Sequence, residues 1–146
     1  MNSQINELLA GFPVIVEQEV VWGDMDSYSH VNNVVYFRYF ENARVEYFRR
    51  LEWFEFEKAT GIGPILAATQ ARFRRALTYP DTIFIGARLQ SLEADRFVLE
   101  HKIASASQSL IATEGHGTVM AFHYGDGKKV PIPDEIKRRI EVLEHS

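Results

Sequence analysis

Cysteine is absent from the 146 residues, and its absence excludes several kinds of chemistry. Without cysteine the chain has no thiol nucleophile, no thiolate-bound zinc or iron–sulfur cluster, and no disulfide framework. Basic residues are also missing from the first part of the chain: the first is Arg38, and five acidic residues precede it. A secretory signal needs a positive n-region and a mitochondrial transit peptide is rich in arginine, so neither is expected.

Long apolar runs and an excess of positive charge are missing as well. No apolar stretch approaches the ~18 residues that a membrane span requires. The chain has 16 basic and 20 acidic residues and a net charge of −4, so it lacks the basic surface of a typical nucleic-acid binder. We therefore expect a cytoplasmic protein whose partner is neither a membrane nor a nucleic acid.

Length and composition predict one globular domain over residues 1–146. Domains of about 100–200 residues are common. Hydrophobic residues make up 46% of the chain and charged residues 25%, which are ordinary values for a globular fold. A domain of this size buries roughly 68–70% of its unfolded surface, so it needs neither a disulfide nor a metal to fold.

A helix of about five turns is predicted from Asn33 onward. Before it, residues 2–10 have a short amphipathic helical pattern, and residues 14–22 alternate as a strand does. Apolar side chains then recur with the helical period at Tyr36, Phe40, Ala43, Tyr47 and Leu51. This stripe is typical of a helix that packs against a core.

Four strands are predicted after the helix, over residues 65–77, 82–92, about 97–103, and 110–124. Turn signals occur at Tyr79-Pro80-Asp81 and Gly125-Asp126-Gly127, and a C-terminal helix follows with Asp134 as its N-cap. One strand, a long helix and four antiparallel strands indicate an α+β domain, with the helix on one face of the sheet. The other face and the open edges favour self-association, most simply as a dimer.

The densest polar segment, residues 24–33, lies between the first strand and the start of the long helix. The first turn of a helix has N–H groups without intrahelical partners, and it can polarise a carbonyl whose oxygen gains charge in a transition state. A carboxylate shortly upstream can attack that carbonyl or activate a water. The segment therefore fits an acyl-transfer site, but Asp and Asn before a helix are also ordinary capping residues.

Two runs in this part of the chain match a known family. Trp22-Gly23-Asp24-Met25-Asp26, then His30-Val31-Asn32-Asn33 and Tyr36, resembles the active-site signature of hotdog-fold acyl-CoA thioesterases, in the 4-hydroxybenzoyl-CoA thioesterase-like family. Tyr39-Phe40-Glu41-Asn42-Ala43-Arg44 is similar to the run on that family's central helix, and the order of elements agrees over nearly the whole chain. The resemblance implies an antiparallel β-sheet wrapped around a long central α-helix.

The resemblance also implies an activity and a set of site residues. It implies hydrolysis of a small-molecule acyl-CoA by a homodimer or homotetramer, with no metal or cofactor beyond the coenzyme A of the substrate. Asp26 matches the catalytic carboxylate, as nucleophile or general base, and the N–H of Asn33 matches the group that polarises the carbonyl. His30 and Asn32 would shape the loop, and Asp24 would fix it by accepting backbone N–H groups. Substrate-binding roles fall to Asn32, Tyr36 and Arg96.

Two positions depart from the family pattern. Ser29 stands where a glycine commonly precedes His-Val-Asn-Asn, and a positive φ there would strain serine. The hairpin expected to hold the phosphates of coenzyme A, residues 91–96, has a single basic residue, Arg96, beside two acidic ones. Weak phosphate binding, or an acyl-carrier-protein substrate, therefore stays open.

Several other residues have plausible chemistry. Glu114 and His116 share a strand face and are interpreted as polar surface or a dimer contact rather than a metal pair. Glu41 is a reserve carboxylate, and Arg44, near the apolar stripe, would need a carboxylate partner if buried. His101 and His123 lie in apolar strand patterns, and their ring nitrogens are expected to find hydrogen-bond partners within the fold. The charges of Arg72, Arg74 and Arg75 are interpreted as a solvent-exposed strand edge.

Three other functions remain open. A hotdog hydratase or dehydratase would use a histidine and a carboxylate, and His30 can supply the first. A non-catalytic acyl-CoA-binding or assembly module would bind the ligand without turnover. A purely structural α+β dimer would leave the match at residues 22–36 as coincidence. Hydrolysis is the leading hypothesis because Asp26 occupies the family's carboxylate position.

Overall fold

The computed structural model describes residues 2–146 as four α-helices, one 3-10 turn and six β-strands. The helices are α1 (Ser3–Leu8), α2 (Asn33–Arg50), α3 (Trp53–Thr60) and α4 (Asp134–Glu144), with the 3-10 turn η1 at Trp22–Asp24. The strands are β1 (Val14–Glu19), β2 (Ile62–Phe73), β3 (Thr82–Leu92), β4 (Arg96–Ser105), β5 (Leu110–His123) and β6 (Lys128–Val130). Over this range no helix combines the length and the hydropathy that a membrane crossing needs.

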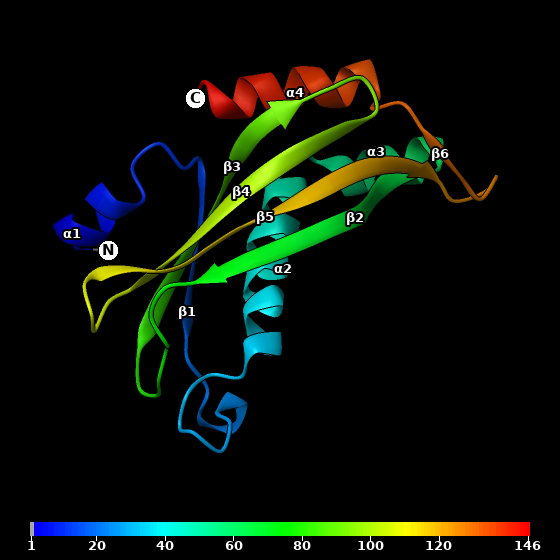
Figure 1. Cartoon of the computed structure of the whole chain (residues 1–146). Helices are drawn as coiled ribbons and strands as arrows, with labels where there is room; N and C mark the ends of the chain where they lie inside the picture. The colour runs from blue at the N-terminus through cyan, green and yellow to red at the C-terminus, as the bar shows by residue number, and fades with distance from the viewer. Residues whose placement is uncertain (1) are drawn as a thin grey trace.

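The strands form one antiparallel sheet in the order β1-β3-β4-β5-β2, with β6 added beside β5 (Figure 1). Strands β3, β4 and β5 follow one another as a meander, whereas β1 pairs with β3 and β2 pairs with β5. The predicted antiparallel strands are therefore confirmed. The sequence pattern did not show that β2 would pair with the last long strand and lie at an edge.

The long helix α2 packs against one face of this sheet (Figure 1). Its predicted stripe is confirmed, since Tyr36, Phe40, Ala43, Tyr47 and Leu51 are all buried. A Cβ atom at Gly115 of β5 would lie only 2.5 Å from the ring of Phe40, so this glycine permits the close approach of α2. The α+β class and the arrangement of a sheet around a long helix are those predicted for a hotdog fold.

The opposite face is covered only in part. Ile5 and Leu9, from the N-terminal region, pack with Phe12, Phe84 and Ala104 in a smaller core cluster. Successive strand residues point to opposite faces, so Glu114 and His116, on either side of Gly115, lie on the face away from α2. That part of the sheet is polar.

Several predicted boundaries differ from the observed ones for local reasons. Strand β1 ends at Glu19 because the chain then turns into η1. Strand β2 begins earlier than predicted because Gly61, with φ 78°, completes the turn after α3. Helix α4 has Pro133, not Asp134, at its N-cap position. The sequence pattern missed α3 and β6.

Strand β2 also ends earlier than predicted. The backbone N–H groups of Arg74 and Arg75 both donate to the carbonyl of Ala112, at 2.9 and 3.0 Å. Two consecutive N–H groups on one acceptor break the regular ladder, so the strand stops at Phe73. This irregular end of β2 borders the loop that precedes α2.

Candidate functional site

The loop between η1 and α2 is closed on itself by Asp26. One carboxylate oxygen of Asp26, Oδ1, accepts hydrogen bonds from the N–H of Tyr28 at 2.8 Å and of His30 at 3.3 Å. The N–H of Asp26 donates to the carbonyl of His30 at 2.7 Å, and an antiparallel bridge joins Met25 to Val31. The carboxylate is therefore held by the loop it organises.

The role predicted for Asp24 is wrong. We expected its carboxylate to accept backbone N–H groups, but within residues 2–146 that carboxylate makes no hydrogen bond. Only the backbone of Asp24 contributes: its carbonyl accepts the N–H of Asn32 at 3.0 Å. The short side chain of Asp26 sits inside the turn and reaches the N–H groups two and four residues ahead, as Asx turns do.

The backbone at Ser29 is left-handed, with φ 62°. The condition raised from the sequence, a positive φ at a serine where the family commonly has glycine, is thus met. Residues other than glycine, asparagine and aspartate are rarely found in the left-handed region, since their Cβ atom approaches the backbone carbonyl. The loop keeps this conformation because the hydrogen bonds of Asp26 surround it.

Replacing Ser29 with glycine is expected to raise the free energy of unfolding by about 1 kcal/mol, because glycine adopts positive φ without strain. Urea unfolding followed by circular dichroism measures the change. Ser29→Ala is the matched control, since it removes the hydroxyl but keeps the Cβ atom. Equal stabilisation in both variants would show that the hydroxyl, not the backbone strain, is responsible.

The start of α2 has one N–H group left over. Asn32 is the N-cap, and its side-chain oxygen accepts the N–H of Val34 at 3.2 Å. The carbonyl of Asn32 accepts the N–H of Val35 at 2.9 Å. Among the described residues the N–H of Asn33 has no acceptor, and it lies at the positive end of the helix. Asn32 therefore caps the helix, and Asn33 offers a free donor.

Asp26 and Asn33 line one small hollow, of about 170 Å³, together with His30, Val31 and Tyr36. The far side of the hollow is residues 73–76, at the irregular end of β2. The Tyr36 hydroxyl accepts the N–H of Leu77 at 3.0 Å, which ties α2 to this segment. Burial raises the pKa of Tyr36, and the negative charge of Asp26 adds to the effect. The phenol therefore keeps its proton and can donate it.

The β2 side of this hollow was not predicted from the sequence. Residues 73–76 lie about forty positions from Asn33. The pairing of β2 with β5 and the hydrogen bond from the Val31 N–H to the carbonyl of Leu77, at 2.8 Å, bring them close. Arg74 is bound to Glu114, with Nε and Nη2 at 3.0 and 2.8 Å from Oε2. Arg75 is exposed and forms no ion pair within the described chain. In the sequence, the only sign that Arg74 and Arg75 would lie beside the Asp26 hollow is their position directly after a strand.

Arg96 lies apart from these residues. It opens β4, next to the β3–β4 turn and close to α4, whereas the loop before α2 is at the other end of the molecule (Figure 1). Its guanidinium is held by the neighbouring Asp95 at 3.0 and 3.1 Å. The structure thus brings together Asp26, His30, Asn33 and Tyr36, but not Arg96, and Asn32 contributes through the helix cap.

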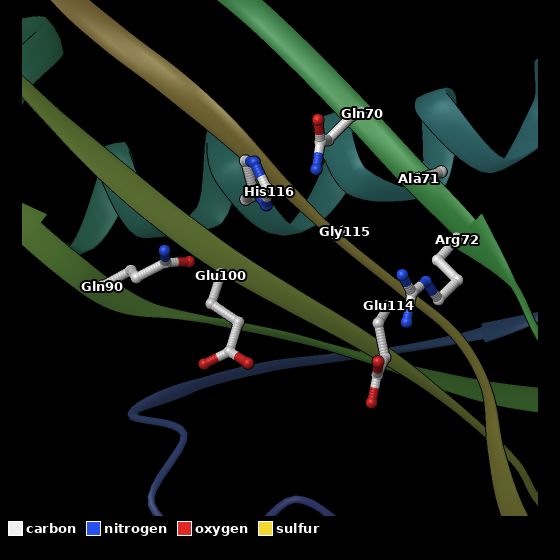
Figure 2. Close-up of a pocket in the computed structure, with 8 residues that line it drawn as sticks. All are labelled: Gln70, Ala71, Arg72, Gln90, Glu100, Glu114, Gly115 and His116. Carbon is white, nitrogen blue, oxygen red and sulfur yellow. The ribbon is translucent and has the colours of Figure 1, made fainter.

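A larger hollow, of about 420 Å³, lies on the face of the sheet away from α2 (Figure 2). Its polar lining is Gln70, Arg72, Gln90, Glu100, Glu114 and His116. Figure 2 shows these side chains in front of the strands and α2 behind them. Within residues 2–146 no group of three or more histidine and carboxylate side chains is placed to hold a metal. Of the pair Glu114 and His116, Glu114 forms an ion pair with Arg74, with Nη2 at 2.8 Å from Oε2.

Only one ring nitrogen of His101 has a hydrogen-bond partner within residues 2–146, whereas we expected both to have one. It is fully buried, its Nδ1 lies 3.0 Å from the carbonyl of Gly86, and its ring stacks on Phe40. Its Nε2 has no partner in the described chain. Burial lowers the pKa of His101 to about 4, and the charge of Arg44 contributes. The imidazole is therefore neutral at pH 7, with Nδ1 carrying the proton that Gly86 accepts.

Comparisons with known proteins agree on one family. A family model described as the Thioesterase-like superfamily matches residues 20–140. Protein THEM6 of Danio rerio is 30% identical over 111 residues, which are 76% of this chain and 54% of THEM6, so the match spans about half of that relative. The long-chain acyl-CoA thioesterase FadM of Escherichia coli is 22% identical over 82% of this chain and 90% of its own length.

Solved structures have the same fold. A thioesterase from Thermus thermophilus, solved with coenzyme A and zinc, is 31% identical, with a TM-score of 0.80. The similarity covers 94% of this chain and 98% of that one. The hotdog arrangement is therefore confirmed by comparison as well as by the order of the strands.

Proposed function

Since the chain belongs to the thioesterase-like superfamily and similar proteins are named thioesterases, we propose that it hydrolyses acyl-CoA to a free acid and coenzyme A. The observation that carries this proposal is the shared hollow of Asp26 and Asn33. A carboxylate and a free helix N-terminal N–H in one hollow supply the two groups that acyl transfer needs. Cytoplasmic location stays part of the proposal.

The N–H of Asn33 would donate to the thioester oxygen and stabilise the charge that develops there. Asp26 would act on the carbonyl carbon in one of two ways. As a nucleophile it adds to the carbon and the C–S bond breaks, giving an anhydride that water then cleaves. As a general base it removes a proton from the water that attacks the carbon. In both routes the released thiolate gains a proton and becomes free coenzyme A.

The neighbouring residues support these two groups. His30 lines the hollow and donates its N–H to Asp26, so it helps to fix the carboxylate. Tyr36 presents a protonated phenol at the same hollow and is placed to contact the substrate. Asn32 holds the start of α2. Phosphate binding by Arg96 would have to come from another copy of the chain. Arg96 begins β4, and the start of β4 lies far from the loop before α2 in the same molecule (Figure 1).

A homodimer or homotetramer is the proposed assembly. Strand β2 is a twelve-residue edge of the sheet, and Leu66 and Phe73 on it are 40% and 44% exposed. Long exposed edges with apolar side chains pair readily with another strand. The same edge ends at the Asp26 hollow, which at about 170 Å³ is smaller than usual ligand pockets of about 300–1,000 Å³. A second copy along β2 would deepen it.

Hydrolysis of an acyl-CoA panel tests the proposal. Release of free thiol is followed for short aliphatic, long-chain and aromatic acyl-CoA substrates, each beside its acyl-carrier-protein thioester. Turnover of at least one thioester is expected, because the carboxylate and the N–H donor share the hollow. Binding of acyl-CoA without turnover would instead support an acyl-CoA-binding module. Hydration of an enoyl-CoA without thiol release would support the hydratase alternative.

A further inference from the structure

Arg44, in the middle of α2, is a buried cation without a partner. Only 6% of its surface is exposed, and in residues 2–146 its guanidinium makes no hydrogen bond or ion pair. Its Nη1 lies 3.3 Å from the position that a Cβ atom would take at Gly117, so it is enclosed between α2 and β5. The sequence predicted a carboxylate partner for a buried arginine, and the folded chain does not supply one.

An unpaired buried charge is strongly destabilising, so folded proteins rarely keep one without a function. Burial lowers the pKa of Arg44, and the negative charge of Glu41, one turn earlier, opposes that effect without forming an ion pair. An acceptor from outside the described chain would give the Arg44 guanidinium the hydrogen-bond partner and the negative charge that it lacks. The question is where such an acceptor can enter.

One hollow leads to Arg44. It has a volume of about 300 Å³ and lies between α2 and β2, lined by Val34, Phe37, Arg38, Glu41, Arg44, Leu66 and Thr69. Its apolar side chains are Val34, Phe37 and Leu66, and its charged groups are two guanidinium groups and one carboxylate. The hollow therefore suits a ligand with an apolar body and a negative end.

The same hollow starts beside the proposed reaction centre. Asn33 and Tyr36 line the Asp26 hollow, while Val34 and Phe37 of the same helical turn line this one. Arg44 follows Asn33 by 11 residues, which corresponds to about 16 Å along the helix axis. An acyl chain whose carbonyl is at Asn33 can thus extend along α2 and bring its far end to the guanidinium.

We propose that this hollow receives the acyl group and that Arg44 selects acyl groups whose far end carries a carboxylate. The proposal rests on the function proposed above and adds a substrate class to it. A carboxylate at the end of an apolar chain provides the missing acceptor, and its charge-assisted hydrogen bonds to the guanidinium are stronger than those of a neutral group. Arg38, at the same hollow, adds a second positive charge.

A second copy of the chain is the other source of an acceptor, and the position of Arg44 argues against it. The residue is 6% exposed, and its buried Nη1 lies beside Gly117, where Leu66 also packs. The end of an acyl chain is narrow enough to enter such a space. A strand or helix of another subunit would cover the hollow but would not fill its depth.

Paired substrates that differ only in the terminal carboxylate test the proposal. The pairs are sebacyl-CoA with decanoyl-CoA and dodecanedioyl-CoA with dodecanoyl-CoA, whose chains come close to the span from Asn33 to Arg44, and kcat/KM is measured for each. The wild-type protein is expected to prefer the carboxylated member of at least one pair. Arg44→Met is expected to reduce that preference by about 10–100-fold, the value of hydrogen bonds to a charged group. Arg44→Lys, which keeps the charge, is expected to retain part of it.

Arg49→Met is the matched control, since Arg49 is an exposed arginine of the same helix that pairs with Glu46 outside the hollow. Its preference should equal that of the wild type. Binding of suberate and of the uncharged 1,8-octanediol, measured by calorimetry, gives a readout independent of hydrolysis. Suberate should bind more tightly than the diol to the wild type, and that difference should shrink in Arg44→Met. If no thioester is hydrolysed but suberate binds in this way, the proposed function fails and the anion site stands.

Three outcomes would overturn the assignment of Arg44. The first is a wild-type preference for the neutral member of every pair, and the second is an Arg44→Met variant that keeps the wild-type preference. The third is a change in sedimentation coefficient with an unaltered preference, which would place the acceptor in a second subunit. If Arg44→Met does not fold, the wild-type preference and the suberate titration still decide the matter.

Discussion

Replacing Asp26 with asparagine is expected to lower kcat for acyl-CoA hydrolysis by about 10²–10⁴-fold, the usual contribution of general-base catalysis. Asparagine has no negative charge, so it can neither attack the carbonyl carbon nor accept a proton from water. It does keep a side-chain oxygen for the N–H groups of Tyr28 and His30. The loop should therefore stay folded, and the melting temperature should remain close to that of the wild type.

Asp24→Asn is the matched control for this experiment. It makes the same change of charge two residues away, at a side chain that forms no hydrogen bond within residues 2–146 and does not line the hollow. Its kcat should fall far less than that of Asp26→Asn. If Asp26→Asn keeps the wild-type rate, Asp26 is not the catalytic carboxylate. Glu41, which lines the neighbouring hollow, would then be the next carboxylate to test.

The second large effect is a loss of stability in acid caused by His101. Its pKa is about 4 in the folded protein and near 6.5 when the chain is unfolded. Between these values the unfolded state binds a proton that the folded state excludes, so the free energy of unfolding falls as the pH falls. The loss is up to about 3 kcal/mol on going from pH 6.5 to 4, at 1.36 kcal/mol per pKa unit.

Urea unfolding of the wild type and His101→Gln over this pH range measures the effect. Removing the imidazole also removes its stacking on Phe40, so the variant is expected to be less stable at pH 7. The informative quantity is the slope, because carboxylates titrate in both proteins. The wild type should lose more stability than the variant between pH 6.5 and 4. Parallel curves would show that His101 is not kept neutral by the fold.

The parts of the structure that were predicted from the sequence depend on local periodicity. The helical spacing of Tyr36, Phe40 and Tyr47 was enough to predict α2 and its buried side. The family pattern also marked Ser29 as a position where positive φ would strain serine, because a glycine is common there, and the φ is positive. Such features are set by residues within a few positions of one another, and a sequence shows them directly.

The rest depends on contacts between distant segments. Residues 73–76 reach the Asp26 hollow through the pairing of β2 with β5 and the hydrogen bonds of Leu77, and no local pattern shows which distant segments will pair. Whether Arg44 has a partner depends on all the segments that pack around it. A carboxylate partner was expected from the sequence, but within residues 2–146 the Nη1 of Arg44 has no partner. The short helix α3 was missed because its eight residues, which start at Trp53, give too few periods to recognise.

The pairing of β2 with β5 also determines when the site can form. Strands β3, β4 and β5 are joined by short turns, whereas Ile62 pairs with His123 and Phe73 with Thr113, across long stretches of chain. Closing a long loop costs conformational entropy before the contacts between the strands form and stabilise it. Such pairings therefore form late in folding. During synthesis, Asp26 and α2 leave the ribosome long before Ala112, whose carbonyl holds the end of β2. A nascent chain thus carries its carboxylate early and gains a formed hollow only when β5 is in place.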